Sequence, residues 1–71
     1  SNENLYNNAD SFAIAFDAAW KHSNLRNEKD KEIEQKIQIA FEKIKAHPFL
    51  IDSPIQAKKI ALFRIKLLGL S

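Results

Sequence analysis

The sequence predicts an all-α fold, a compact bundle of three helices, and three observations support this. Glycine occurs once and proline twice in 71 residues, so the sequence has very few of the residues that form the tight turns of a β-protein. Alanine, leucine, lysine and glutamate, which are good helix formers, recur throughout the chain. Apolar residues also repeat at helical spacing in three separate stretches.

The small size of the chain limits how it can be stabilised. A domain of 71 residues buries only about 60% of the surface that its unfolded chain exposes. The sequence contains no cysteine, which excludes disulfides and thiolate zinc sites. Stability must therefore come from dense apolar packing or from another molecule. The chain also lacks methionine, and we interpret it as a fragment of a longer protein, with a flexible lead-in at residues 1–8 and one helical domain at residues 9–71.

The first helix is predicted over residues 10–22. Asn8 or Asp10 can cap its first turn, because short polar side chains accept hydrogen bonds from the free amides there. Its apolar residues fall on one face of a helical wheel, which we expect to point into the core. This face consists of Phe12, Ala15, Phe16, Ala19 and Trp20.

The second helix is predicted over residues 27–46. Asn27 is the expected cap, and Glu28 lies in the first turn, where the helix dipole favours negative charge. A narrow apolar stripe follows, typical of an outer helix that turns one face inward. This stripe consists of Ile33, Ile37, Ala40, Phe41 and Ile44. Pro48 should end the helix, because the residue before a proline avoids the α conformation.

The next segment, residues 48–52, contains three large apolar side chains in succession and is predicted to be a loop packed over the core. The third helix is then predicted over residues 54–68. Ser53 should cap it in a capping box with Gln56, and Pro54 suits the first helical position. Gly69 is placed to end it in a left-handed conformation.

The third helix is apolar over most of its circumference. Ala61, Ile65 and Leu68 form one apolar arc, and Ile60, Phe63 and Leu67 form a second. A helix in a three-helix bundle turns only about half its surface toward its neighbours, so the second arc either packs against residues 49–51 or is left for a partner. The predicted core consists of Phe12, Phe16, Ala19, Trp20, Ile33, Ile37, Phe41, Ile44, Leu62, Ile65 and Leu68.

The sequence contains no pattern typical of catalysis. His22 and His47 each fall near a predicted helix end, and neither has a second ligand at metal-binding spacing. His47, Asp52 and Ser53 supply the residue types of a hydrolytic triad, but Ser53 is needed as a helix cap and no oxyanion hole is indicated. One glycine cannot build a phosphate-binding loop. We therefore expect a non-enzymatic protein without metal or cofactor.

The apolar excess of the third helix predicts an interaction or assembly module of an intracellular, cytoplasmic protein. A large exposed apolar patch usually marks an interface. The partner would be a second copy, another chain or the remainder of the parent protein. The predicted partner-binding residues are Phe49, Ile60, Phe63, Arg64 and Leu67.

Two other functions remain open. The alternative is an accessory nucleic-acid-binding domain of a larger DNA- or RNA-processing protein, which would use the basic residues of the third helix. These are Lys58, Lys59, Arg64 and Lys66. Against it stand a net charge of only +2 and a loop from His47 to Ser53 that exceeds a helix-turn-helix turn. Binding to a membrane surface is disfavoured, because Arg64 interrupts the apolar sector.

Overall fold

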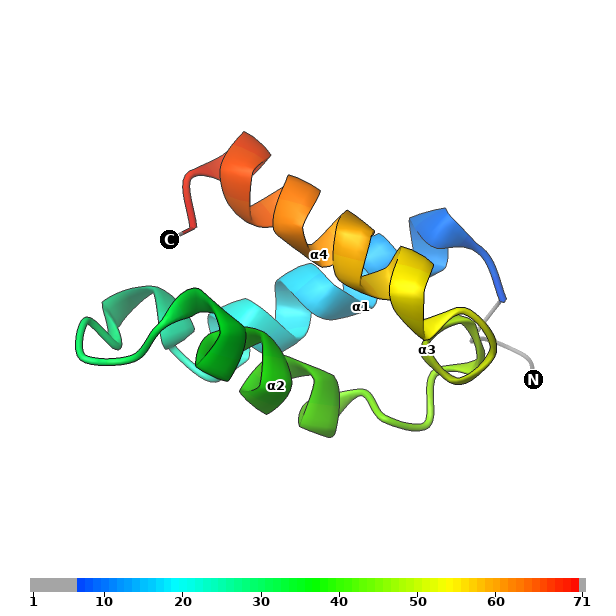
Figure 1. Cartoon of the computed structure of the whole chain (residues 1–71), viewed down its shortest axis with the longest axis horizontal. Helices are drawn as coiled ribbons and strands as arrows, with labels where there is room; N and C mark the ends of the chain where they lie inside the picture. Colours follow the sequence, from blue (N-terminus) through cyan, green and yellow to red (C-terminus); the bar gives the residue numbers. More distant parts are fainter. Residues whose placement is uncertain (1–6, 71) are drawn as a thin grey trace.

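The computed structural model describes residues 7–70, and all the regular structure in that range is helical, which confirms the all-α prediction. The helices are α1 (Ala9–His22), the 3₁₀ helix η1 (Leu25–Asn27), α2 (Ile33–Lys43), α3 (Pro48–Asp52) and α4 (Pro54–Leu68). α1 packs against both α2 and α4, while the short α3 closes one end against α1 and α4 (Figure 1). Apart from Asn7 and Asn8, the predicted lead-in lies outside the described residues.

α1 agrees closely with the prediction. The Ser11 amide donates to Oδ1 of Asn8 at 2.8 Å, so Asn8 is the cap. Four residues of its apolar face, Phe12, Phe16, Ala19 and Trp20, are buried, while Ala15 is partly exposed. Phe16 packs against Trp20 with ring centroids 5.5 Å apart. This helix therefore supplies the large side chains of the core.

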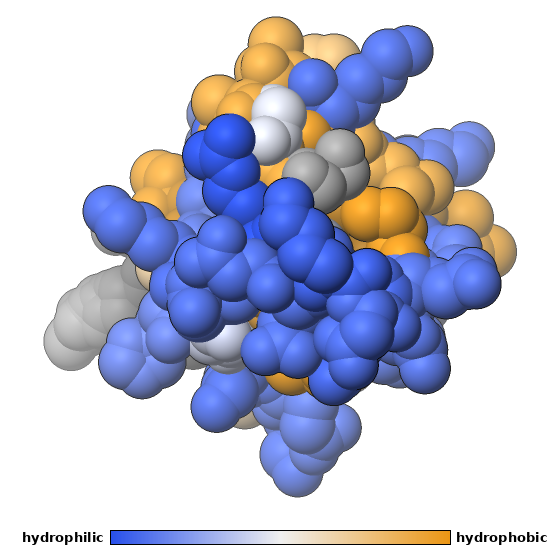
Figure 2. Space-filling model, turned by 90° about the vertical axis from the view of Figure 1, so that its left-hand side faces the viewer, coloured by the Kyte–Doolittle hydropathy of each residue, from blue (hydrophilic) through white to orange (hydrophobic). Residues whose placement is uncertain are grey.

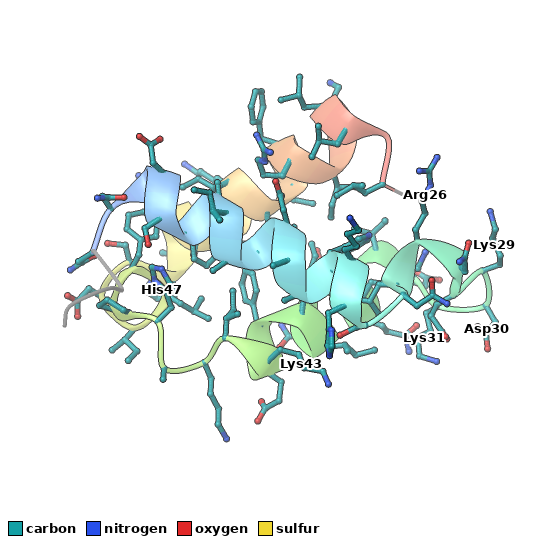
Figure 3. The ribbon with its side chains drawn as sticks, turned by 180° about the vertical axis from the view of Figure 1, so that it is seen from behind. Arg26, Lys29, Asp30, Lys31, Lys43 and His47 are labelled. Atoms are coloured by element: carbon teal, nitrogen blue, oxygen red, sulfur yellow. The ribbon has the colours of Figure 1, made fainter. Side chains whose placement is uncertain are left out.

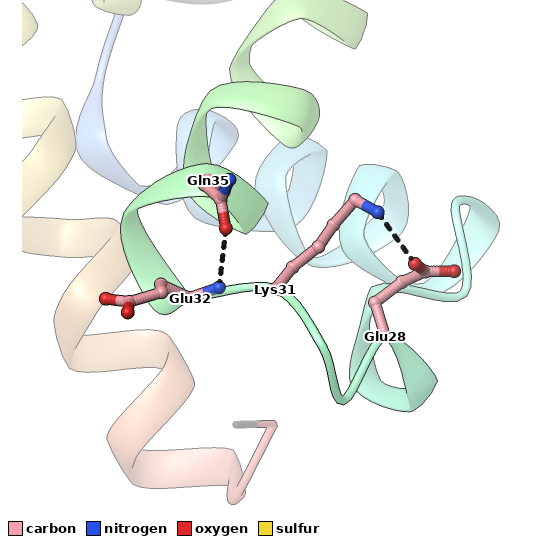
Figure 4. A network of polar contacts seen from close by, with 4 residues as sticks. All are labelled: Glu28, Lys31, Glu32 and Gln35. Atoms are coloured by element: carbon pink, nitrogen blue, oxygen red, sulfur yellow. Dashed lines mark hydrogen bonds and ion pairs between the residues drawn. The ribbon is translucent and has the colours of Figure 1, made fainter.

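α2 is shorter at both ends than the predicted 27–46. Residues 28–31 carry no apolar side chain to bury, so a longer helix would gain no packing. Residues 28–31 instead form hydrogen-bonded turns. The Glu32 amide donates to Oε1 of Gln35 at 2.8 Å where α2 begins (Figure 4). Leu25, which the predicted core omitted, is only 2% exposed and anchors η1. The helix ends at Lys43, because Ile44 leaves the helical conformation.

The predicted loop at residues 48–52 packs over the core but is a helical turn, α3. Pro48 occupies its first turn, and the Phe49 amide donates to Nδ1 of His47 at 3.2 Å. Phe49 packs against Phe12 with ring centroids 5.5 Å apart. A histidine cap is not among the usual N-cap residues, which is why the sequence pattern did not reveal this turn.

α4 has the predicted bounds but a different inner face. Ala57, Ala61 and Ile65, spaced four residues apart, are buried and form one line along the helix. Leu62 and Leu68, which were assigned to the core, are 42% and 45% exposed. The small alanines let α4 approach the large aromatic rings of α1 closely, so the leucines remain outside.

The ends of α4 follow the prediction only in part. Ser53 stands at the N-cap position, but its side chain makes no capping hydrogen bond, so the predicted capping box is wrong. Its carbonyl instead accepts from the Ala57 amide at 2.8 Å. Gly69 ends the helix with φ of 62°, the left-handed conformation that glycine adopts without strain.

The buried core joins all the helices except α3, whose side chains are half-buried or exposed. Ile33, Phe41 and Ile44, predicted as core, pack against it while remaining partly exposed. The fully buried apolar cluster consists of Phe12, Phe16, Ala19, Trp20, Leu25, Ile37, Ala40, Ala57, Ala61 and Ile65.

Candidate nucleic-acid interface

The basic residues of α4 divide into two pairs. Lys59 and Lys66 are exposed, and neither takes part in an ion pair within residues 7–70. Lys58 and Arg64 each contact an acidic side chain of another helix. Only the first pair is therefore free to meet an anion without breaking an existing contact.

Arg64 is held by Asp17 of α1. Its Nε donates to Oδ1 of Asp17 at 3.1 Å, and its Nη2 donates to Oδ2. These hydrogen bonds raise the pKa of Arg64 above its ordinary value, so the guanidinium stays charged. Both side chains are about three-quarters buried, and the pair fixes α4 against α1. Arg64 is therefore a structural residue, and it does not stand free on the predicted partner-binding surface.

Lys58 connects α4 to α2. Its Nζ lies 2.6 Å from Oε1 of Glu34, and the side chains of Lys58 and Glu34 are 42% and 61% exposed. An exposed ion pair of this kind contributes little to stability, typically about 0–1 kcal/mol. A phosphate could therefore compete with Glu34 for Lys58 at small cost.

The five residues predicted to bind a partner differ in how exposed they are. Phe63 and Leu67 are 60% and 58% exposed, whereas Phe49 and Ile60 are half-buried against the core. Arg64, as described, is bound to Asp17. Figure 2 shows apolar atoms gathered at one edge of the face that it displays, beside a broad hydrophilic area. The assignment of Phe63 and Leu67 to an interface stays a prediction.

A second group of basic side chains lies around the C-terminal end of α1, and sequence reasoning missed it. An open groove of about 880 Å³ runs between α1 and the end of α2, with Lys21, His22 and Lys43 among its lining residues. A smaller cavity of about 340 Å³ lies between η1 and the end of α4, and Lys21 and Arg26 line it. Lys21 therefore borders both.

The basic residues of this group are visible in the sequence, but their positions at helix ends have a simpler explanation. Lys43 and His22 fall in the last turns of their helices, where positive charge is explained by the helix dipole alone. They line one groove because α1 packs against α2, as Figure 3 shows, and periodicity does not specify which helices are neighbours.

His47, the buried histidine, has both ring nitrogens engaged. Nδ1 accepts from the Phe49 amide, so Nε2 carries the hydrogen and donates to Oγ of Ser11 at 3.2 Å. Asp52 instead accepts from the Asn7 side chain at 2.7 Å. The triad residue types at positions 47, 52 and 53 are therefore not assembled for catalysis.

Two other kinds of site, a metal centre and a membrane-spanning helix, are absent from the described residues. Residues 7–70 hold no group of three or more His, Cys, Asp or Glu side chains that could bind a metal ion. None of the helices described is long and apolar enough to cross a membrane.

The segment that argued against a helix-turn-helix contains a helix. Because α3 occupies residues 48–52, the connections around it are short: residues 44–47 lead from α2 to α3, and Ser53 alone joins α3 to α4. The distance in sequence from His47 to Ser53 is thus no longer an objection.

Comparison with known proteins assigns the chain to a family. No curated protein and no solved structure matches the sequence. A family model described as "Cyanobacterial helix-turn-helix domain" matches residues 10–69. A domain of that type points to nucleic acid as the partner, so the prediction that ranked a protein partner above nucleic acid is wrong. The match spans all four α-helices almost completely, and the chain therefore belongs to the cyanobacterial helix-turn-helix domain family.

Proposed function

We propose that this domain binds duplex DNA as an accessory part of a larger DNA-processing protein. The observation that carries the proposal is the family match over residues 10–69. Helix-turn-helix domains place one helix in the major groove while the others support it. The proposal concerns a binding domain and not an enzyme.

α4 is the helix best suited to lie against DNA. It packs on α1 through a narrow line of small residues, which leaves most of its circumference outside the core. Lys59 and Lys66 are exposed on it and can reach phosphate oxygens. Lys58 can join them if it exchanges Glu34 for a phosphate.

The exposed face of α4 offers little for reading bases. Gln56, in the first turn, is its only amide side chain, and the one arginine, Arg64, is held by Asp17. Apolar side chains such as Phe63 and Leu67 can contact thymine methyl groups but cannot recognise a donor and acceptor pattern. We therefore infer that phosphate contacts dominate and that sequence preference is weak.

The proposal is tested by titrating a fluorescently labelled mixed-sequence duplex with the domain while salt is varied. Binding should weaken as salt rises, with a slope of log K against log salt close to −0.9 for each phosphate contacted. The K59Q/K66Q variant should lower the size of that slope by about 2.

The matched control is K31Q/K45Q, which removes the same charge. Lys31 and Lys45 lie in the connecting segments before and after α2, away from α4, so we expect neither to contact the phosphates that α4 meets. Absence of binding to any duplex at low salt, or binding that salt does not weaken, would overturn the proposal.

A further inference from the structure

The basic residues Lys21, Arg26 and Lys43 form a surface that we call the cationic track. Lys43 lies at the end of α2, below α1, and Arg26 lies in η1, beyond the C-terminal end of α1 (Figure 3). Lys21 borders the groove that Lys43 lines and also the cavity that Arg26 lines. The three cations thus follow two adjoining depressions rather than scattering over the surface.

Few acidic groups offset the charge of the track. All three side chains are exposed, and none forms an ion pair within residues 7–70. The groove has no acidic lining residue, and the one acid beside the smaller cavity, Asp17, is already bound to Arg64. An anion that entered either depression would therefore meet uncompensated positive charge.

The helix ends beneath the track oppose an anion only weakly. The last residues of α1 and α2, His22 and Lys43, line different parts of the groove, and each helix C-terminus carries about half of a negative charge, which acts over about one turn. Against these two half charges stand the full positive charges of Lys21 and Lys43, both on long side chains that line the groove. Positive charge therefore exceeds negative charge among the groups at the groove.

The floor of the groove suits a chain that alternates anions with less polar groups. It is built from the small residues Ala15, Ala18 and Ala19 together with Ile44, so a backbone can approach closely. His22 at its rim can donate a ring hydrogen bond to a phosphate oxygen or a sugar oxygen. A sugar–phosphate backbone has this alternation, whereas a single small anion would use only one of the cations.

We propose that the cationic track is a second DNA-contacting surface, along which a phosphate backbone runs from Lys43 past Lys21 to Arg26. The inference rests on the proposed DNA-binding function and adds residues outside α4 to it. It gives the domain contacts on two sides of α1, since α2 and α4 pack on different faces of that helix (Figure 1).

The test compares two double variants that remove equal charge. K21Q/K43Q takes two cations from the track, and K31Q/K45Q takes two from the connecting segments before and after α2. With the same labelled duplex, K21Q/K43Q should reduce the size of the salt slope by about 2 and weaken binding at low salt. K31Q/K45Q should change neither quantity measurably, and circular dichroism should show both variants folded.

The outcomes separate this inference from the proposed function. If the wild-type domain binds duplex and K59Q/K66Q weakens it while K21Q/K43Q does not, the track is wrong and DNA binding stands. If both charge-matched variants weaken binding equally, net charge explains the effect and the track is also wrong. If the wild-type domain binds vesicles containing anionic lipid but no duplex, the track and the proposed function both fail.

A second measurement does not depend on variants. Acetylation of lysines in the presence and absence of duplex reports which side chains are covered. DNA should protect Lys21 and Lys43 but leave Lys45, which is next to the groove and paired with Glu42, reactive. Equal protection of Lys43 and Lys45 would contradict a defined track.

Discussion

Asp17 of α1 and Arg64 of α4, 47 positions apart in the sequence, are joined by two hydrogen bonds in a partly buried ion pair. The two helices otherwise meet through apolar side chains, which are not directional. A forked guanidinium–carboxylate contact has a defined geometry, so it fixes the rotation of α4 against α1.

The Asp17–Arg64 pair should contribute to stability as a unit. We expect Asp17→Asn and Arg64→Gln each to lower the midpoint of thermal unfolding, and the double variant to lose less than the sum of the two. Circular dichroism at a fixed pH and salt concentration measures the midpoints, and the difference gives the coupling. Strictly additive losses would show that the pair does not act in solution as it does in the structure.

The two faces of α4 should respond oppositely to substitution. Ala61 is fully buried, so Ala61→Leu overpacks the core and should cost about 1–3 kcal/mol of unfolding free energy. Phe63 is 60% exposed, so Phe63→Asp should change the unfolding free energy by no more than about 0.5 kcal/mol. Urea denaturation measures both, and a Phe63→Asp variant that fails to fold would contradict the observed orientation of the helix.

His47 should stabilise the junction between α2 and α3 through its two hydrogen bonds. His47→Leu introduces an apolar side chain of similar size and leaves the Phe49 amide without its acceptor, which should cost about 1–3 kcal/mol. His47→Asn should recover part of the loss, because asparagine is a good N-cap. Ser11→Ala, which removes only the second bond, serves as the milder control in the same urea titrations.

Much of the fold was predictable, because local signals and burial agreed. α1 and α4 have strong caps or stops, Asn8 for the first and Gly69 for the second, and both were predicted within one residue at either end. The second helix was predicted too long, because residues 27–31 have helical charge patterning but nothing to bury. Charge patterning supports a helix only weakly unless an apolar face accompanies it.

The inner face of α4 was not predictable from hydrophobicity alone. The sequence offers large apolar residues on several sides of that helix, and the structure buries the alanines. The reason lies in α1. Its Phe16 and Trp20 fill the space between the two helices, so the facing side of α4 must carry small side chains. Such matching of side-chain volumes depends on both helices of a packed pair, so it cannot be predicted from the sequence of one helix alone.

The candidate site was predictable in residue type but not in arrangement. Of the four basic residues chosen on α4, Lys58 and Arg64 turned out to be paired with acids far away in the sequence. Lys21, Arg26 and Lys43 come from three separate elements, and only the packing of α1 against its neighbours brings them to adjoining cavities. A surface built from several helices can be predicted only when it is known which helices pack against each other.

The hydrogen bond from Nε1 of Trp20 to the carbonyl of Leu70, 3.3 Å long, has a practical consequence. Trp20 is the sole tryptophan of the chain, and it lines the same cavity as Lys21 and Arg26. Its fluorescence therefore reports on the contact between α1 and the segment that follows α4. A duplex that reached Arg26 should change the tryptophan emission, so binding can be followed without a label.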